Sequence, residues 1–116
     1  MKDFIKNFFG RKEEDNYIPV GCDIENAIRK SITVSGRVQG VGFRFFTQGE
    51  ANKLRLTGWV KNLNNGNVTM EVQGAAEDIE ELINRLKKGN GFSKVTDIEI
   101  KDLTVDREEN KFAIAY

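Results

Sequence analysis

The chain has 116 residues, enough for one domain with a single core. Hydrophobic residues make up 39% of it and charged residues 31%, and the 18 basic and 18 acidic residues cancel. No net charge therefore favours binding to nucleic acid or to an anionic membrane. The absence of histidine and the single cysteine exclude imidazole bases, Ser-His and Cys-His nucleophile pairs, histidine-ligated zinc and thiolate clusters. We expect any catalysis to use arginine, lysine, carboxylates, amides and the backbone.

Residues 1–30 form an extension that precedes the regular pattern, and we expect it to be partly disordered or a short helix. Its apolar residues at helical spacing are Phe4, Ile5, Phe8 and Phe9. Two interpretations stay open: a segment that docks on a partner or a membrane surface, or a frayed or self-packed extension. Short helices are marginal alone, which favours the second. Without a continuous apolar leader or a second cysteine beside Cys22, we expect a cytoplasmic protein.

A regular pattern begins at Ser31, so we place a domain at residues 31–116. Apolar residues at every second position predict a half-buried strand over 31–38. A glycine-rich loop at 39–42 leads into a predicted helix over 43–54, most of one side of which is apolar. A second strand is predicted over 56–61. The Asn-Asn-Gly turn at 64–66 then predicts a hairpin, and the next strand has alternating Val68, Met70 and Val72.

The clearest predicted element is a helix over 77–88. Its apolar stripe is Ile79, Leu82, Ile83 and Leu86. Acidic residues at its start and lysines at its end match the helix dipole. Strands over 94–103 and 111–116 follow. The order βαββαβ plus a final strand predicts a ferredoxin-like α+β sandwich, with two helices on one face of a largely antiparallel sheet of four or five strands. Because this plan supports many functions, it does not assign one.

Residues 36–44 run from a strand through a short loop into a helix. This geometry directs unpaired backbone N–H groups and the positive end of the helix dipole at one point. Glycines allow close approach of an anion, and an arginine adds a charged planar fork. The predicted phosphate site consists of Gln39, Gly40, Val41, Gly42, Phe43 and Arg44. A tight turn beside a solvated arginine is the simpler alternative. The loop matches neither a Walker A nor a Rossmann pattern.

Asn62 follows the second predicted strand, just before the hairpin. In a ferredoxin-like sheet this strand end can lie near the glycine-rich loop, where the side-chain amide would orient a water. The alternative is an asparagine that caps the turn, which is the commoner role for this residue before a hairpin.

The two segments together resemble the two signatures of the acylphosphatase family. The first match is Val34-x-Gly36-x-Val38-Gln39-Gly40-Val41-x-Phe43-Arg44. The second is Gly58-Trp59-Val60-Lys61-Asn62, followed by Gly66, Val68 and Gly74. The resemblance covers residues 31–116. It implies hydrolysis of an acyl phosphate to a carboxylate and inorganic phosphate, without a metal or organic cofactor. Arg44 and the amides of 39–43 would bind phosphate, and Asn62 would orient the attacking water.

The sequence leaves three other functions to consider. A non-catalytic regulatory domain would bind phosphate or another small molecule in the same loop. A single-stranded RNA binder would stack bases on aromatic residues of the central strands, but these strands present Ile32, Val34, Val68, Met70 and Val72. Acylphosphatase-like domains also open larger hydrogenase-maturation proteins, but the sequence has no zinc-finger cysteines, so we expect a free-standing enzyme without later domains. We expect a free-standing monomer that binds neither nucleic acid nor a membrane.

Overall fold

The computed structural model describes residues 23–116, so the apolar cluster predicted near the N-terminus lies outside the described residues. A 3₁₀ turn at Ile24–Asn26 comes first. The elements that follow are β1 (Ile28–Arg37), α1 (Phe43–Lys53), β2 (Thr57–Asn62), β3 (Val68–Gly74), α2 (Ala76–Lys88), β4 (Lys94–Leu103) and β5 (Phe112–Ile114). The predicted βαββαβ order with a final strand is confirmed.

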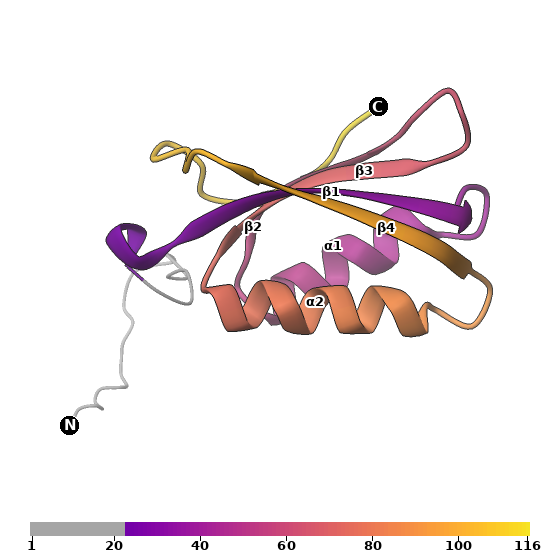
Figure 1. Ribbon diagram of the computed structural model, residues 1–116, viewed down its shortest axis with the longest axis horizontal. Coiled ribbons are helices and arrows are strands. Elements are labelled where there is room, and N and C mark those ends of the chain that lie inside the picture. Colours follow the sequence, from indigo (N-terminus) through magenta and orange to yellow (C-terminus); the bar gives the residue numbers. More distant parts are fainter. Residues whose placement is uncertain (1–22) are drawn as a thin grey trace.

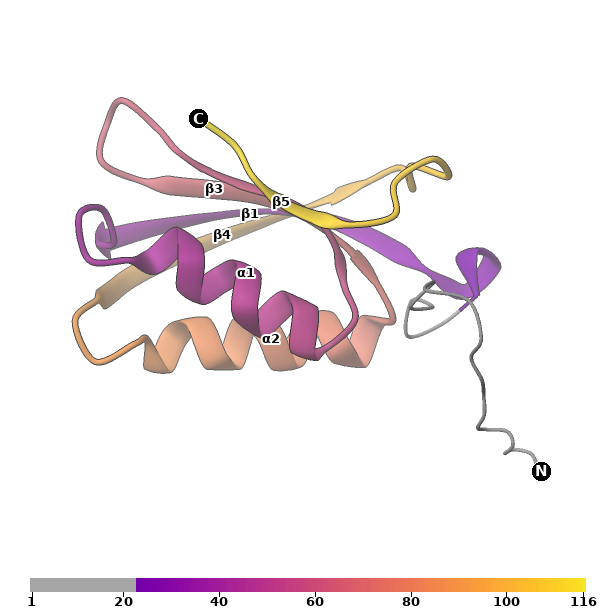
Figure 2. The same cartoon turned by 180° about the vertical axis from the view of Figure 1, so that it is seen from behind.

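The strands form one sheet in the order β4-β1-β3-β2-β5. All neighbours are antiparallel except β2 and β5, which are parallel. Both helices cover the same face of the sheet, as the two opposite views show (Figures 1 and 2). The predicted ferredoxin-like α+β sandwich is therefore confirmed, with five strands. No helix in the described part of the chain is long and apolar enough to cross a bilayer.

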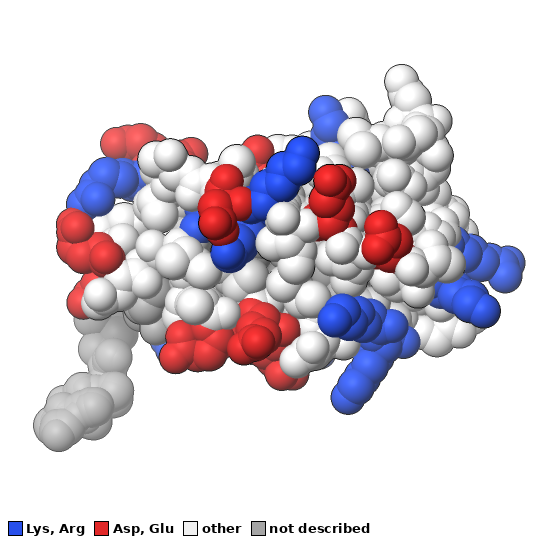
Figure 3. Space-filling view, in the orientation of Figure 1, with Lys and Arg blue, Asp and Glu red and all other residues white. Residues whose placement is uncertain are grey.

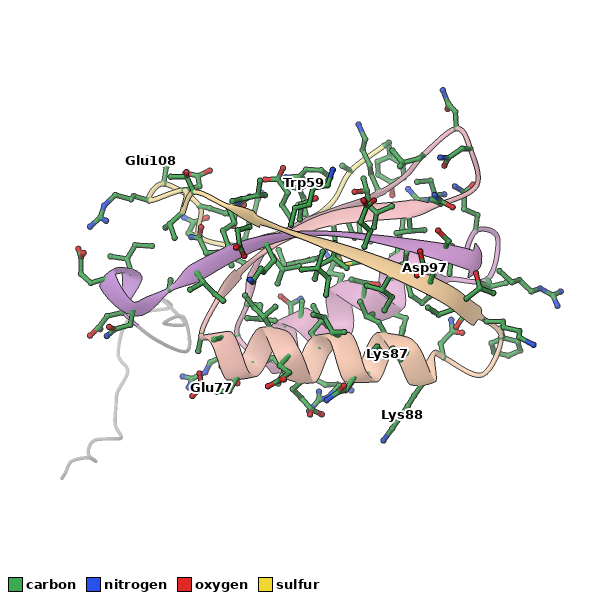
Figure 4. The ribbon with its side chains drawn as sticks, viewed as in Figure 1. Trp59, Glu77, Lys87, Lys88, Asp97 and Glu108 are labelled. Carbon is green, nitrogen blue, oxygen red and sulfur yellow. The ribbon has the colours of Figure 1, made fainter. Side chains whose placement is uncertain are left out.

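The core lies between this face and the helices. Its fully buried strand residues include Ile32, Val34, Val68, Met70 and Val72, each 0% exposed. These five side chains face the helices, so a ligand on the open face of the sheet would not meet them. The outer face has the paired hydroxyls of Thr33 and Thr69, 3.0 Å apart, and the indole of Trp59 (Figure 4).

Helix α2 shows the predicted distribution of charge along its length. Acidic side chains gather over its start and basic ones over its end (Figure 3), with Glu77 and Lys88 marking the two ends in Figure 4. Carboxylates near the positive end and ammonium groups near the negative end stabilise a helix. On its inner side, Ile79, Leu82 and Leu86 are buried, as the apolar stripe predicted.

Strand β1 begins at Ile28, three residues before the predicted start, so the expected division between residues 30 and 31 falls inside a strand. Arg29, in this first part of the strand, is only 5% exposed although charged. It pairs with Glu109 at 2.8 Å and with Glu71 at 3.0 Å. The hydrogen bond to Glu109, followed by the one to Glu71, raises the pKa of the guanidinium against the opposing effect of burial. The apolar alternation is interrupted by Lys30, which occupies the strand face of Ile28 and Ile32. The local pattern therefore did not extend the strand back to Ile28, where pairing with β3 begins.

Strand β5 is shorter than predicted: it spans Phe112–Ile114 rather than 111–116. It lies parallel to β2, and the N–H of Ala115 still donates to the carbonyl of Val60 at 2.8 Å. Tyr116 has left the sheet, with 90% of its surface exposed. The alternation of Phe112, Ile114 and Tyr116 predicted a longer strand, but pairing with β2 ends at Ile114.

The position of β5 depends on Gly58 in β2. This residue has a φ of +144°, and a Cβ there would lie 1.8 Å from the carbonyl oxygen of Glu71 and 3.2 Å from the ring of Phe112. Its N–H donates to the carbonyl of Lys111 at 2.9 Å. Only glycine therefore allows β2 to fit between β3 and β5.

We predict that Gly58→Ala lowers the free energy of unfolding by about 3 kcal/mol or more, because the methyl group meets backbone and the φ is strained. Urea unfolding monitored by tryptophan fluorescence measures the change. The matched control is Gly49→Ala in α1, where a Cβ meets nothing within 4 Å. There we expect up to about 1 kcal/mol of stabilisation. Equal effects of the two substitutions would contradict this account of Gly58.

Candidate active site

The loop between β1 and α1 curves because two glycines occupy left-handed backbone conformations. Gly40 has a φ of +73°, and Gly42, which precedes the first residue of α1, has a φ of +76°. Within residues 23–116, the N–H groups of residues 39–45 find no acceptor. Such a run of amides at the positive end of a helix forms a concave site for an anion.

A pocket of about 230 Å³ opens at this loop. It is lined by Val38, Gly40, Gly42, Phe43, Arg44, Phe45 and Asn62. The structure therefore brings the two motifs together, since Asn62 at the end of β2 shares a pocket with the start of α1. Arg44 is the only charged side chain in this lining, so the pocket favours an anion. The predicted residues Gln39 and Val41 do not line it, and only their backbone amides are candidates for contact with a ligand.

The C-terminal residues hold the guanidinium of Arg44. Its Nη1 donates to the carbonyl of Ala115 at 3.2 Å, and its carbon Cζ lies 4.8 Å from the centre of the Tyr116 ring. Figure 2 shows the segment after β5 running toward the end of the molecule that carries the β1–α1 loop and the β2–β3 hairpin. One hydrogen bond and one cation–π contact limit the freedom of a long side chain and leave its other N–H groups for a ligand.

Asn62 has a buried amide oxygen, Oδ1, with no hydrogen-bond partner among the described residues. The hairpin turn is served by Asn65 instead, whose Oδ1 accepts from the N–H of Asn67 at 3.0 Å. Turn capping therefore does not explain Asn62. A buried acceptor costs free energy unless a bound molecule donates to it, which makes the Asn62 oxygen a candidate contact for a water or ligand in the pocket.

Two side chains that the sequence reasoning did not single out for this role fix the loop. Gln39 Nε2 donates to the carbonyls of Leu63 at 2.7 Å and Asn67 at 2.8 Å. Asn90 Nδ2 donates to the carbonyl of Val41 at 2.8 Å. Gln39 thus ties the loop to the hairpin directly after Asn62, and Asn90 ties it to the segment after α2. Neither contact has a signal in the local sequence, because donor and acceptor lie 24 to 49 residues apart.

Taken together, the pocket offers backbone donors, one guanidinium and one unpaired amide oxygen. The backbone donors and the guanidinium suit the oxygens of a phosphoryl group. The amide oxygen can accept a hydrogen bond from a water molecule.

Comparison with known proteins agrees with the two motifs. The acylphosphatase family model matches residues 30–114. The chain belongs to the acylphosphatase family. An acylphosphatase from Clostridium beijerinckii is 56% identical over 89 residues, which is 77% of this chain and 99% of the relative.

Solved structures agree as well. The crystal structure of acylphosphatase from Bacillus subtilis has a TM-score of 0.73 at 42% identity and covers 77% of this chain and 99% of its own. An acylphosphatase from Coxiella burnetii has a TM-score of 0.74 at 34% identity, with 78% and 95% covered. The predicted family and activity are confirmed: the chain is a hydrolase of acid anhydrides that cleaves acyl phosphates to a carboxylate and phosphate. None of these matches favours the non-catalytic alternative.

We predict that Gln39→Glu lowers kcat/KM for an acyl phosphate by roughly tenfold or more. The new carboxylate would face two backbone carbonyls, so the loop would separate from the hairpin and from Asn62. Steady-state kinetics with benzoyl phosphate measure the loss. The control is Gln73→Glu at the opposite end of β3, where the side-chain amide donates to the carbonyl of Asp106 at 2.9 Å. We expect this control to lower stability without a comparable loss of activity, whereas matching losses would contradict a positioning role for Gln39.

Proposed function

We propose that the chain hydrolyses acyl phosphates with Arg44 and the amides of residues 39–43 holding the phosphoryl group and Asn62 orienting the attacking water. The observation that carries this proposal is the shared pocket, into which the start of α1 and the end of β2 bring a cation, free amides and an unpaired amide oxygen. Each group has one role, and no histidine is required.

In the proposed reaction, the water oxygen forms a bond to phosphorus while the bond from phosphorus to the acyl oxygen breaks. The carboxylate leaves with the bonding electron pair, and the protons of the water pass to the product phosphate or to solvent. A water that donates one hydrogen to the Asn62 oxygen has a lone pair directed away from it, toward the phosphoryl group. Phosphoryl transfer depends mainly on such positioning and on charge stabilisation.

The leaving group explains how the site functions with so few polar side chains. A carboxylic acid has a pKa of about 4, so a carboxylate departs at neutral pH without receiving a proton. The donors at the loop and Arg44 stabilise negative charge on the phosphoryl oxygens in a preorganised geometry. Phosphate monoesters, whose alkoxide leaving groups require acid or metal assistance, would be poor substrates.

We also propose that the protein acts as a cytoplasmic monomer, with all its catalytic residues in the predicted domain 31–116, and that residues 1–30, of which 28–30 belong to β1, take no part in the reaction. A single cysteine in the chain is typical of a reducing compartment.

Arg44 is the first test of the phosphate site. We expect Arg44→Ala to abolish measurable hydrolysis of benzoyl phosphate, and Arg44→Lys to abolish most of it, because an ammonium group cannot hold two phosphoryl oxygens as a planar fork does. Circular dichroism and thermal unfolding verify that both variants fold. Near-normal turnover by a folded Arg44→Ala protein would refute the assignment.

Asn62 tests the water-positioning role separately. For Asn62→Ala we predict a fall in kcat of roughly 100-fold or more, as for other lost oriented polar groups. Inhibition by inorganic phosphate should persist, since its main contacts are with the loop and Arg44. Kinetics with and without added phosphate distinguish the two effects. Loss of phosphate inhibition would show that Asn62 binds the phosphoryl group rather than the water.

A further inference from the structure

The first turn of α1 contains three phenylalanines with different surroundings. Phe43 is 1% exposed, and Phe46 packs against it with ring centres 6.0 Å apart. Phe45 is 69% exposed. The helical repeat explains the division, because positions 43 and 46 lie one turn apart on the core side and 45 points elsewhere. Phe45 therefore adds little to the core.

Phe45 is instead part of the pocket wall, together with Arg44 and Asn62. One exposed phenylalanine is ordinary on a protein surface, so its place in this wall is the informative observation. Two other aromatic side chains are still more exposed, Phe92 at 73% and Tyr116 at 90%, yet neither lines the pocket. Of the three, Phe45 is the one that forms part of the pocket wall, whereas Tyr116 lies against the guanidinium of Arg44.

The wall of the pocket decides what the acyl group can contact. The pocket has a volume of about 230 Å³ and opens to solvent. With the phosphoryl group held by Arg44 and the loop amides, the acyl group extends from there along the remaining wall. The apolar surface available in the wall for that contact comes from Val38, Phe43 and Phe45, and the first two are 1% exposed.

We propose that Phe45 contacts the acyl group of the substrate and makes the enzyme prefer aromatic acyl phosphates to acetyl phosphate. This inference rests on the proposed phosphate site, because it assumes that the phosphoryl group is held by Arg44 and the loop. The ring of Phe45 offers a face to a planar aryl group, and aromatic pairs of this kind are favourable beyond simple burial. An acetyl group is too short to cover the ring.

The test compares kcat/KM for benzoyl phosphate with kcat/KM for acetyl phosphate. Phe45→Ala should lower the ratio of the two roughly three- to tenfold, the range of one aromatic contact. Phe45→Tyr keeps the ring and should restore most of the ratio. Phe92→Ala is the matched control: it removes a similarly exposed ring outside the pocket wall and should leave the ratio unchanged. Thermal unfolding and phosphate inhibition of each variant report on the fold and on the phosphate site.

An unchanged ratio in a folded Phe45→Ala protein would overturn the inference, and so would equal losses for both substrates, which indicate a structural role. A change of the same size in Phe92→Ala would also overturn it, because the effect would not belong to the pocket wall. If the unmodified chain hydrolysed neither substrate, the proposed function itself would fail. That result differs from an active enzyme whose preference does not depend on Phe45.

Discussion

The left-handed curvature of the loop between β1 and α1 is the constraint on which the rest of the site depends. Gly40 and Gly42 adopt positive φ values, and without that curvature the free amides and the start of α1 would not face one point. Residues with a Cβ rarely adopt this conformation. The curvature is then held from two sides, by Gln39 on the hairpin and by Asn90 on the segment after α2. The curved loop is thus held in place before any ligand arrives, and preorganisation of this kind reduces the free energy that ordering costs on binding.

The sheet supplies the other half of the site through its unusual edge. Because β5 runs parallel to β2, the last residues of the chain point toward the same end as the loop and the hairpin. Ala115 and Tyr116 can then hold the side chain of Arg44. Gly58 allows this arrangement, since a side chain there would strike β3 and the ring of Phe112. Gly58 does not line the pocket, yet it contributes to the position of Arg44 because it allows β5 to lie beside β2.

Much of the fold was predictable because most elements carry their own periodic signal. The apolar alternation of β3 and the stripe of α2 correspond to buried side chains, and the predicted range 94–103 agrees with β4. The predictions differed from the structure where tertiary contacts override the local pattern. Strand β1 begins at Ile28 although Lys30 interrupts the apolar pattern, because it pairs with β3 there and Glu71 and Glu109 neutralise the buried Arg29. Strand β5 ends early because its pairing with β2 stops at Ile114. The sequence correctly placed five apolar residues in strands. It did not show that their side chains lie on the face covered by the helices, which the structure does; the residues are Ile32, Val34, Val68, Met70 and Val72.

For the site, the sequence by itself determined the inventory. It contains no histidine, it places an arginine after a glycine-rich loop, and it contains two motifs that resemble one family. Glycine content and residue type are local properties, so they can be read without a structure. The tertiary structure alone decided the distances: Asn62 joins the loop in one pocket, its oxygen is buried without a partner, the C-terminus holds Arg44, and Phe45 forms part of the wall. These contacts join residues far apart in the chain, and only the packing of β1, β2 and β5 against α1 brings them within reach of one another.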